Sequence, residues 1–289
     1  MSPTTRPINL NHSGPLELDW MLRFLGERGV EGIELLNETS YKRSIPLAHG
    51  DAVVSISLGP EGPVADATVE DPRDAAEAET RVLRMLDLNT DVLAVGAALA
   101  SDAKMRPLIK RRPGLRIPGT ADPAELAIRA VIGQQVSVVG ARTLAGRLVA
   151  AYGRPLGIHD PDLTHTFPRP ADLADASLAE IGMPGARKNA IRTLSAALAD
   201  GTVVLDPATD RDELREKLIA LPGIGPWTAD YVAMRGLDDP DVFLASDLGV
   251  RKALEKMGLP SKPAEAMRVS ERWRPWRSYA VQYLWSSLG

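Results

Sequence analysis

A short stretch toward the C-terminal end decides the fold, and it reads Leu221-Pro222-Gly223-Ile224-Gly225-Pro226-Trp227-Thr228-Ala229-Asp230-Tyr231. Two glycines flank one apolar residue, and a proline follows the second glycine. Gly225 suits the N-cap of a helix and Pro226 its first position, because the amide that proline lacks has no partner there anyway. We therefore predict a tight turn followed by a helix from Pro226 to about Gly236.

The residues before this turn predict another helix. Asp210 can cap its N-terminus and Glu213 can reach back to the cap, which is the capping-box pattern. The apolar residues that follow fall on one helical face, and they are Leu214, Leu218 and Ile219. Pro222 then ends the helix. The chain thus carries two helices joined by a hairpin-like turn.

The turn between the two helices has the features of a phosphate-binding loop. Gly223 and Gly225 allow a positive φ and have no Cβ in the way, so a phosphate can approach the free amides at the positive end of the second helix. We expect Gly223, Ile224 and Gly225 to hold a nucleic-acid backbone without reading its bases. An ordinary corner between helices uses the same residue types, so the turn alone leaves both interpretations open.

The longer string resembles the helix-hairpin-helix of the DNA glycosylase superfamily that is named after this hairpin and a Gly/Pro-rich loop ending in an Asp. Other segments resemble its alkylation-repair branch, the DNA-3-methyladenine glycosylase II family, and they are residues 21–25, 41–44, 112–119, 132–138 and 273–280. The early segments and the string at 273–280 are specific to that branch. The resemblance covers the chain almost from end to end.

The resemblance implies an α+β fold that is mainly helical, with two helical domains flanking a cleft and an N-terminal antiparallel β-sheet domain. Two β-like runs, 52–58 and 65–69, are separated by a Gly/Pro-rich turn and favour the sheet. The implied domains are residues 1–85 for the sheet, 86–112 plus 240–289 for a discontinuous helical domain, and 113–239 for the helical domain that carries the hairpin.

Asp247 is the candidate catalytic residue. Breaking an N-glycosidic bond builds positive charge on the sugar, which a carboxylate near C1′ stabilises. Asp247 precedes a helical run, 248–257, so it is also suited to be an N-cap, and the two roles can coexist. In the family the essential Asp lies shortly after the second hairpin helix, and the resemblance therefore implies that Asp247 is catalytic.

Aromatic residues form the candidate base pocket. Trp227 and Tyr231 are four residues apart and share a helix face, and the resemblance adds Trp285. Together they can receive a flipped base by stacking, although aromatics at this spacing also pack in cores. Relatives that nick the backbone have a Lys at the position of Trp227, which forms a Schiff base. A Trp cannot form that adduct, so we expect water as the nucleophile and no lyase activity.

The loop Gly133-Gln134-Gln135 matches the family's intercalating loop, and we expect Gln134 and Gln135 to contact DNA. Gln135 stands where an apolar wedge is expected. It can fill the gap left by the flipped base, insert poorly, or serve only as a polar residue at a helix end. The resemblance also implies a monovalent cation, held by the carbonyls of Ile219, Leu221 and Ile224 and bridging to a DNA phosphate.

Composition excludes several other functions. The 289 residues include no cysteine, which removes disulfides, thiol nucleophiles and Cys-ligated iron-sulfur clusters, and the four histidines show no metal-ligand pattern. We expect no required cofactor and no nucleotide cofactor. The net charge is −4, but residues 248–289 carry eight Lys/Arg against three Asp/Glu. With no membrane-length apolar stretch and no leader, a cytoplasmic location is expected.

These observations predict a monofunctional DNA glycosylase of base excision repair that removes alkylated purines, of the 3-methyladenine and 7-methylguanine type, from duplex DNA. Base flipping requires one copy, so we expect a monomer. Two alternatives stay open. One is a glycosylase for an oxidised or deaminated base, and the other is a non-enzymatic protein that uses the hairpin only to bind DNA.

Overall fold

Five strands form an antiparallel sheet from the N-terminal part of the chain. The structure, a computed structural model, describes residues 3–288. The strands lie in the order β1-β5-β4-β3-β2, and they are β1 (Thr4–Ile8), β2 (Glu34–Leu36), β3 (Ser40–Pro46), β4 (Asp51–Gly59) and β5 (Gly62–Val69). The two β-like runs predicted from the sequence are strands β4 and β5, which pair through a tight turn between Gly59 and Gly62.

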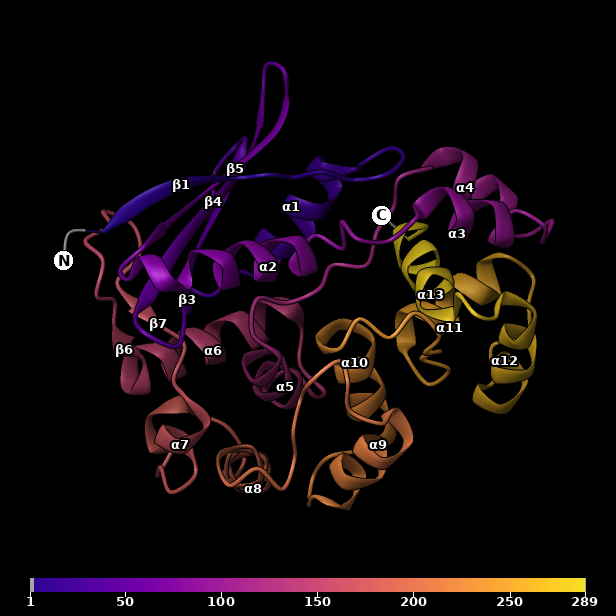
Figure 1. The fold of residues 1–289 in the computed structure, drawn as a ribbon. Coiled ribbons are helices and arrows are strands. Elements are labelled where there is room, and N and C mark those ends of the chain that lie inside the picture. Colours follow the sequence, from indigo (N-terminus) through magenta and orange to yellow (C-terminus); the bar gives the residue numbers. More distant parts are fainter. Residues whose placement is uncertain (1–2, 289) are drawn as a thin grey trace.

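Both faces of this sheet are covered in part. Helices α1 (Leu18–Glu27) and α2 (Ala75–Met85), the latter preceded by the 3-10 helix η1 (Pro72–Asp74), lie on one face (Figure 1). Alternate residues of β4, such as Val54 and Ile56, point into this layer because successive side chains of a strand face opposite sides. On the other face Val53 packs against the segment that holds the short strands β6 (Arg154–Pro155) and β7 (His165–Thr166).

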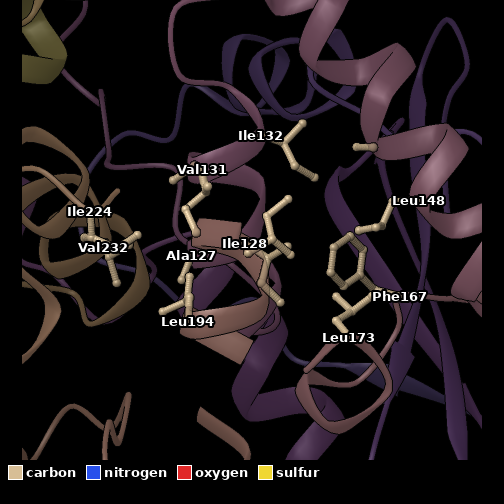
Figure 2. Packing of buried hydrophobic residues seen from close by; sticks show 14 of the residues in the cluster. Ala127, Ile128, Val131, Ile132, Leu148, Phe167, Leu173, Leu194, Ile224 and Val232 are labelled. Carbon is tan, nitrogen blue, oxygen red and sulfur yellow. The ribbon is translucent and has the colours of Figure 1, made fainter. Parts of the chain in front are cut away.

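Helix α5 (Pro123–Ile132) lies at the centre of the next core. Around it pack α6 (Val138–Tyr152), α7 (Pro170–Leu173), the 3-10 helix η2 (Ala179–Ile181), α8 (Gly185–Ala199), α9 (Arg211–Ala220) and α10 (Pro226–Gly236). Figure 2 shows Ala127, Ile128 and Val131 of α5 lying between Val232 of α10 and Phe167. A helix that is apolar on nearly all sides is buried on nearly all sides, and α5 is such a helix.

A second helical core is built from segments far apart in the sequence. Its elements are α3 (Val92–Leu99), α4 (Arg106–Arg111), α11 (Leu248–Lys256), α12 (Pro263–Ser270), the 3-10 helix η3 (Glu271–Trp273) and α13 (Arg277–Ser286). Figure 1 shows α3 and α4 beside α11 and α13. The fold is therefore α+β and mainly helical, with two helical cores and an N-terminal antiparallel sheet, as predicted. The domain boundaries given above stay a prediction.

Four charged side chains join the sheet to the central core. Arg43 of β3 binds Glu125 of α5 at 2.6 Å, and Arg129 of α5 binds both Glu125, at 2.6 Å, and Glu34 of β2, at 2.8 Å. Glu34, Arg43 and Glu125 are buried. Burial alone would raise the pKa of the Glu34 carboxyl, but Arg129 and Arg43 hold it below its ordinary value. This group of four is called the charged junction below.

The hairpin of α9 and α10 forms largely as predicted. The Asp210 carboxylate caps α9 by accepting the Glu213 amide at 2.9 Å. The second half of the predicted capping box is wrong, because the Glu213 carboxylate pairs with Lys217 one turn later, at 2.8 Å. Gly225 is the N-cap of α10 and Pro226 its first residue. Within residues 3–288 no helix combines the length and the apolar character that crossing a bilayer requires.

Candidate active site

A cavity of about 620 Å³ lies where the sheet layer and the two helical cores meet. Its lining includes residues of α1, the N-terminal strands, α5 and the loop after it, α10, α13 and the start of α11. Asp247, Trp227, Tyr231 and Trp285 all lie on its wall. The structure thus brings together four residues that were selected from three separate segments of the sequence.

Asp247 is half-buried and is held by three N–H donors. One carboxylate oxygen, Oδ1, accepts the Val250 amide at 2.9 Å and the Trp285 indole N–H at 2.8 Å. The other, Oδ2, accepts the Trp227 indole N–H at 3.1 Å. Asp247 is therefore the N-cap of α11 and a wall residue of the cavity at once. The two interpretations drawn from the sequence are compatible in one side chain.

Gly249 makes room for this arrangement and was not found by sequence reasoning. A Cβ at this position would lie 3.0 Å from Trp285 Cδ1 and 3.1 Å from Asp247 Oδ1. Both distances are shorter than ordinary van der Waals contact, so a larger residue would push the Trp285 ring and the carboxylate apart. A glycine in the first turn of a helix is not by itself a signal of such a contact, which depends on α13 packing against α11.

The aromatic residues stack on one another as well as lining the cavity. The Trp227 and Tyr231 rings are 5.0 Å apart and 15° from parallel, while Trp285 is tilted by 52° at 6.5 Å from Tyr231. A base cannot enter between Trp227 and Tyr231 because the two rings already cover each other. All three rings also pack against the second helical core. The three rings therefore line the cavity and pack in the core at once, and their role in binding a base stays a prediction.

Two arginines, Arg235 and Arg28, lie close to Tyr231 on the wall of the cavity. Arg235 donates to the Tyr231 hydroxyl and to the Pro118 carbonyl. Arg28, the C-cap residue of α1, lies over the Phe24 ring, with its Cζ 3.7 Å from the ring centroid. Removal from water would raise the pKa of Tyr231, but the charges of Arg235 and Arg28 lower it below its ordinary value. Sequence reasoning missed Phe24 and Arg28, since nothing local marks them as neighbours of the hairpin helix. It also missed Arg235, which lies on α10 itself, one turn after Tyr231.

The hairpin turn differs in detail from the prediction. Gly223 has φ +85° and is packed so closely that a Cβ there would lie 2.6 Å from the Ala190 Cβ of α8. Gly225 is extended, with φ −93°, and does not use the positive φ expected of it. The Ile224 side chain is buried, and its amide binds the Leu221 carbonyl at 3.1 Å. Among residues 3–288 no partner is found for the amides of Gly223, Gly225 and Trp227, so these three are available to a phosphate.

The two glutamines of the predicted intercalating loop face different ways. Gln135 is exposed and has φ +56°, in the left-handed region. Gln134 is half-buried, and its amide nitrogen donates to the Gly223 carbonyl at 3.0 Å and to Thr228 Oγ1 at 3.1 Å. The neighbouring Val136 and Val138 line the cavity and are exposed. Of the two glutamines, Gln135 has a side chain for which no hydrogen bond is found within residues 3–288.

The basic excess near the C-terminus is partly neutralised inside the protein. Arg274 and Arg277 both pair with Asp241, and Arg272 pairs with Asp102. The net charge of this segment therefore overstates the free positive charge that DNA would meet. Among residues 3–288 no group of three or more His, Asp or Glu side chains is placed to hold a metal ion.

Comparison with known proteins agrees with this geometry. Residues 7–122 match the family described as AlkA N-terminal domain, and residues 128–278 match the HhH-GPD superfamily base excision DNA repair protein family. The chain is 34% identical to "DNA-3-methyladenine glycosylase 2" of Escherichia coli (strain K12), an alignment that covers 97% of each protein.

Two further relatives extend the comparison. The chain is 44% identical, over 99% of its length, to the "Probable bifunctional transcriptional activator/DNA repair enzyme AlkA" of Mycobacterium tuberculosis, of which it spans only 58%. A solved structure, the 3-methyladenine DNA-glycosylase from Archaeoglobus fulgidus, superimposes with a TM-score of 0.84 at 22% identity and 97% coverage of each chain. That likeness concerns the fold.

Proposed function

The chain belongs to the HhH-GPD superfamily of base excision DNA repair proteins, and we propose that it is a DNA glycosylase that hydrolyses the N-glycosidic bond of alkylated purines in duplex DNA. The observation that carries this proposal is the placement of Asp247. Its carboxylate lies on the wall of a cavity large enough for a base, next to the helix-hairpin-helix, and N–H donors fix both of its oxygens.

This arrangement suits a reaction in which the sugar becomes positively charged. The three donors hold the carboxylate in one orientation, so no reorganisation is needed when charge develops at C1′. Asp247 then stabilises the sugar cation and orients the water that attacks it. A purine methylated on a ring nitrogen carries a positive charge and leaves without a general acid.

The base is proposed to stack on the faces of Trp227, Tyr231 and Trp285 that the three rings leave free. A cationic base is attracted to such faces by the ring quadrupole. Because stacking reads little of the base's edge, we propose a broad range of alkylated purines as substrates. The hairpin amides of Gly223 and Gly225 hold the strand by its phosphate while the nucleotide is out of the stack.

Two features support hydrolysis without lyase chemistry. The residue of α10 that points toward the catalytic carboxylate is Trp227, which cannot form a Schiff base. None of the described residues that line the cavity is a lysine. Borohydride is expected to trap no covalent adduct between the protein and abasic duplex DNA. A trapped band on a denaturing gel would contradict this part of the proposal.

The implied monovalent cation fits the hairpin. The carbonyls of Ile219 and Ile224 accept no hydrogen bond from any residue between 3 and 288, and that of Leu221 accepts only the Ile224 amide. Carbonyl oxygens without partners suit a hard cation. When bound, such an ion supplies positive charge between the hairpin and a DNA phosphate.

The direct test is release of free base from methylated duplex DNA. We expect the protein to release 3-methyladenine and 7-methylguanine, separated by chromatography, and Asp247→Asn to release neither. Binding of the duplex without release by the wild-type protein would favour the non-enzymatic alternative. Asp247→Asn changes the charge and not the helix cap, since Asn is as good an N-cap as Asp and keeps α11 intact.

One observation favours a second substrate class. Arg28 places a guanidinium group on the wall of the cavity, where it can donate to a carbonyl oxygen of a neutral lesion. An oxidised or deaminated base presents such an oxygen. Release of 8-oxoguanine or hypoxanthine from matched duplexes, with no release of alkylated bases, would show that oxidised or deaminated bases, and not alkylated purines, are the substrates.

A further inference from the structure

Gln134 lies between the two elements that are proposed to touch DNA. The sequence analysis expected it to contact DNA itself, but its side-chain amide is turned toward the hairpin. It donates to the Gly223 carbonyl at 3.0 Å and to Thr228 Oγ1 at 3.1 Å. Thr228 is only 3% exposed. A buried hydroxyl requires a partner, and Gln134 supplies one from outside the helix.

The main chain of Gln134 is held from another side. Arg187 of α8 donates to the Gln134 carbonyl at 2.6 Å. The same helix packs against the hairpin, because Ala190 is the residue that a Cβ on Gly223 would strike. Helix α8, the hairpin turn and the loop after α5 therefore meet around one glutamine.

The next residue is the one free to act on DNA. Gln135 is exposed and left-handed, with φ +56°, a conformation that costs free energy for any residue other than glycine. Such a conformation persists only when its surroundings determine it. The hydrogen bonds on both sides of Gln134 provide that constraint, because they fix the residue immediately before Gln135 at its side chain and at its carbonyl.

We propose that Gln134 is a positioning residue that locks the loop bearing Gln135 to the helix-hairpin-helix. The phosphate contact and the gap-filling residue then reach the duplex as one rigid unit. This inference rests on the proposed function, which supplies the gap that Gln135 fills. Gln134 itself does not touch DNA, since both donors of its amide group are used within the protein.

The test measures gap filling and base release separately. The first readout uses a duplex with a tetrahydrofuran abasic site beside 2-aminopurine, whose fluorescence reports insertion of a side chain into the stack. The second is the single-turnover rate of 3-methyladenine release. The variants are Gln134→Ala, Gln135→Ala, the double variant, and Thr228→Val, which removes one of the same hydrogen bonds from the hairpin side.

We expect Gln134→Ala to reduce the fluorescence change and to slow base release by roughly three- to tenfold for each hydrogen bond lost. Thr228→Val is expected to reproduce part of this effect. The double variant is expected to be no slower than Gln135→Ala, because a residue that acts only through Gln135 has nothing left to position. Thermal unfolding of each variant shows that the fold is kept.

Two results would overturn the inference. If the double variant loses the product of the two single losses, Gln134 acts independently of Gln135. If Gln134→Ala leaves both the fluorescence and the rate of base release unchanged, the hydrogen bonds of Gln134 do not position Gln135. The fluorescence readout needs no catalysis, so a protein that inserts Gln135 in a Gln134-dependent way but releases no alkylated base would refute the proposed function and keep this inference.

Discussion

The hairpin turn and the cavity wall beside it differ in the groups they present, which are backbone amides in the turn and a side-chain carboxylate in the wall. In the turn, the free groups are the backbone amides of Gly223, Gly225 and Trp227, and no side chain is needed there. In the wall, the Asp247 carboxylate depends on indole groups from α10 and α13, and on a glycine that leaves space between them. The residues of a backbone site lie close together in the sequence, whereas those of a side-chain site are brought together by packing.

The largest effect is expected at the wall. Asp247→Asn should lower the rate of base release by at least about 10³-fold, since it removes the charge that stabilises the sugar cation. Duplex affinity should stay within a few-fold, because the hairpin amides are untouched. Single-turnover release and fluorescence anisotropy give the two values. If Asp247→Asn lowers duplex affinity as much as it lowers the rate of base release, the cavity wall and the hairpin turn do not have separate roles.

The next largest effect concerns the indole donors. Trp285→Phe keeps an aromatic ring and removes one N–H from Asp247, so we expect a roughly 10- to 100-fold loss of single-turnover rate, the range for a hydrogen bond to a charged group. Trp227→Phe should behave alike. The substrate concentration at half-maximal rate should change little, because the stacking faces remain. If it rises while the maximal rate is kept, the indoles serve base binding alone.

A change in the turn should act on binding and folding instead. Gly223→Ala places a Cβ 2.6 Å from that of Ala190 and at φ +85°, and we expect it to destabilise the fold by about 1–3 kcal/mol. Duplex affinity should fall because the amides are displaced. Thermal unfolding and anisotropy measure both. An unchanged melting temperature would show that the turn is more adaptable than its packing indicates.

The smallest effect is expected at Gly225, two residues after Gly223. Gly225 has an extended backbone, and a Cβ there meets nothing within 4 Å. Gly225→Ala should therefore change the free energy of unfolding by less than about 0.5 kcal/mol. It is the matched control for Gly223→Ala. If both substitutions destabilise the protein equally, the left-handed conformation of Gly223 is not what distinguishes the two glycines.

The sequence predicted the local features well. Residue types and spacing over short distances predicted the strands β4 and β5 and the N-cap and first residue of α10, while the α+β class was implied by the family resemblance. The resemblance to a known family selected Asp247 and Trp285, and the structure places both on the cavity wall. Their roles stay predictions that the substitutions above address.

What the sequence could not show depends on contacts between distant segments. Phe24 and Arg28 reach the cavity only because α1 lies against it, and Gly249 matters only because Trp285 packs over α11. The hydrogen bonds of the Gln134 side chain could not be predicted for the same reason, since its partners on the hairpin lie about ninety residues away, and its contact with DNA stays a prediction. Likewise, Glu213 forms an ion pair with Lys217 and not the capping box, a choice between two local partners that spacing does not decide.

The charged junction has a consequence for anyone who would transplant this scaffold. Glu34 and Arg43 come from the strands, while Glu125 and Arg129 come from α5, and all four line the rear of the cavity. Grafting the helical part onto another protein would keep the Glu125–Arg129 pair of α5, but Glu125 would lose Arg43 and Arg129 would lose Glu34. It would also open the chamber to bulk solvent. The sheet thus supplies part of the cavity wall, and a transferable unit that keeps the charged junction has to include it.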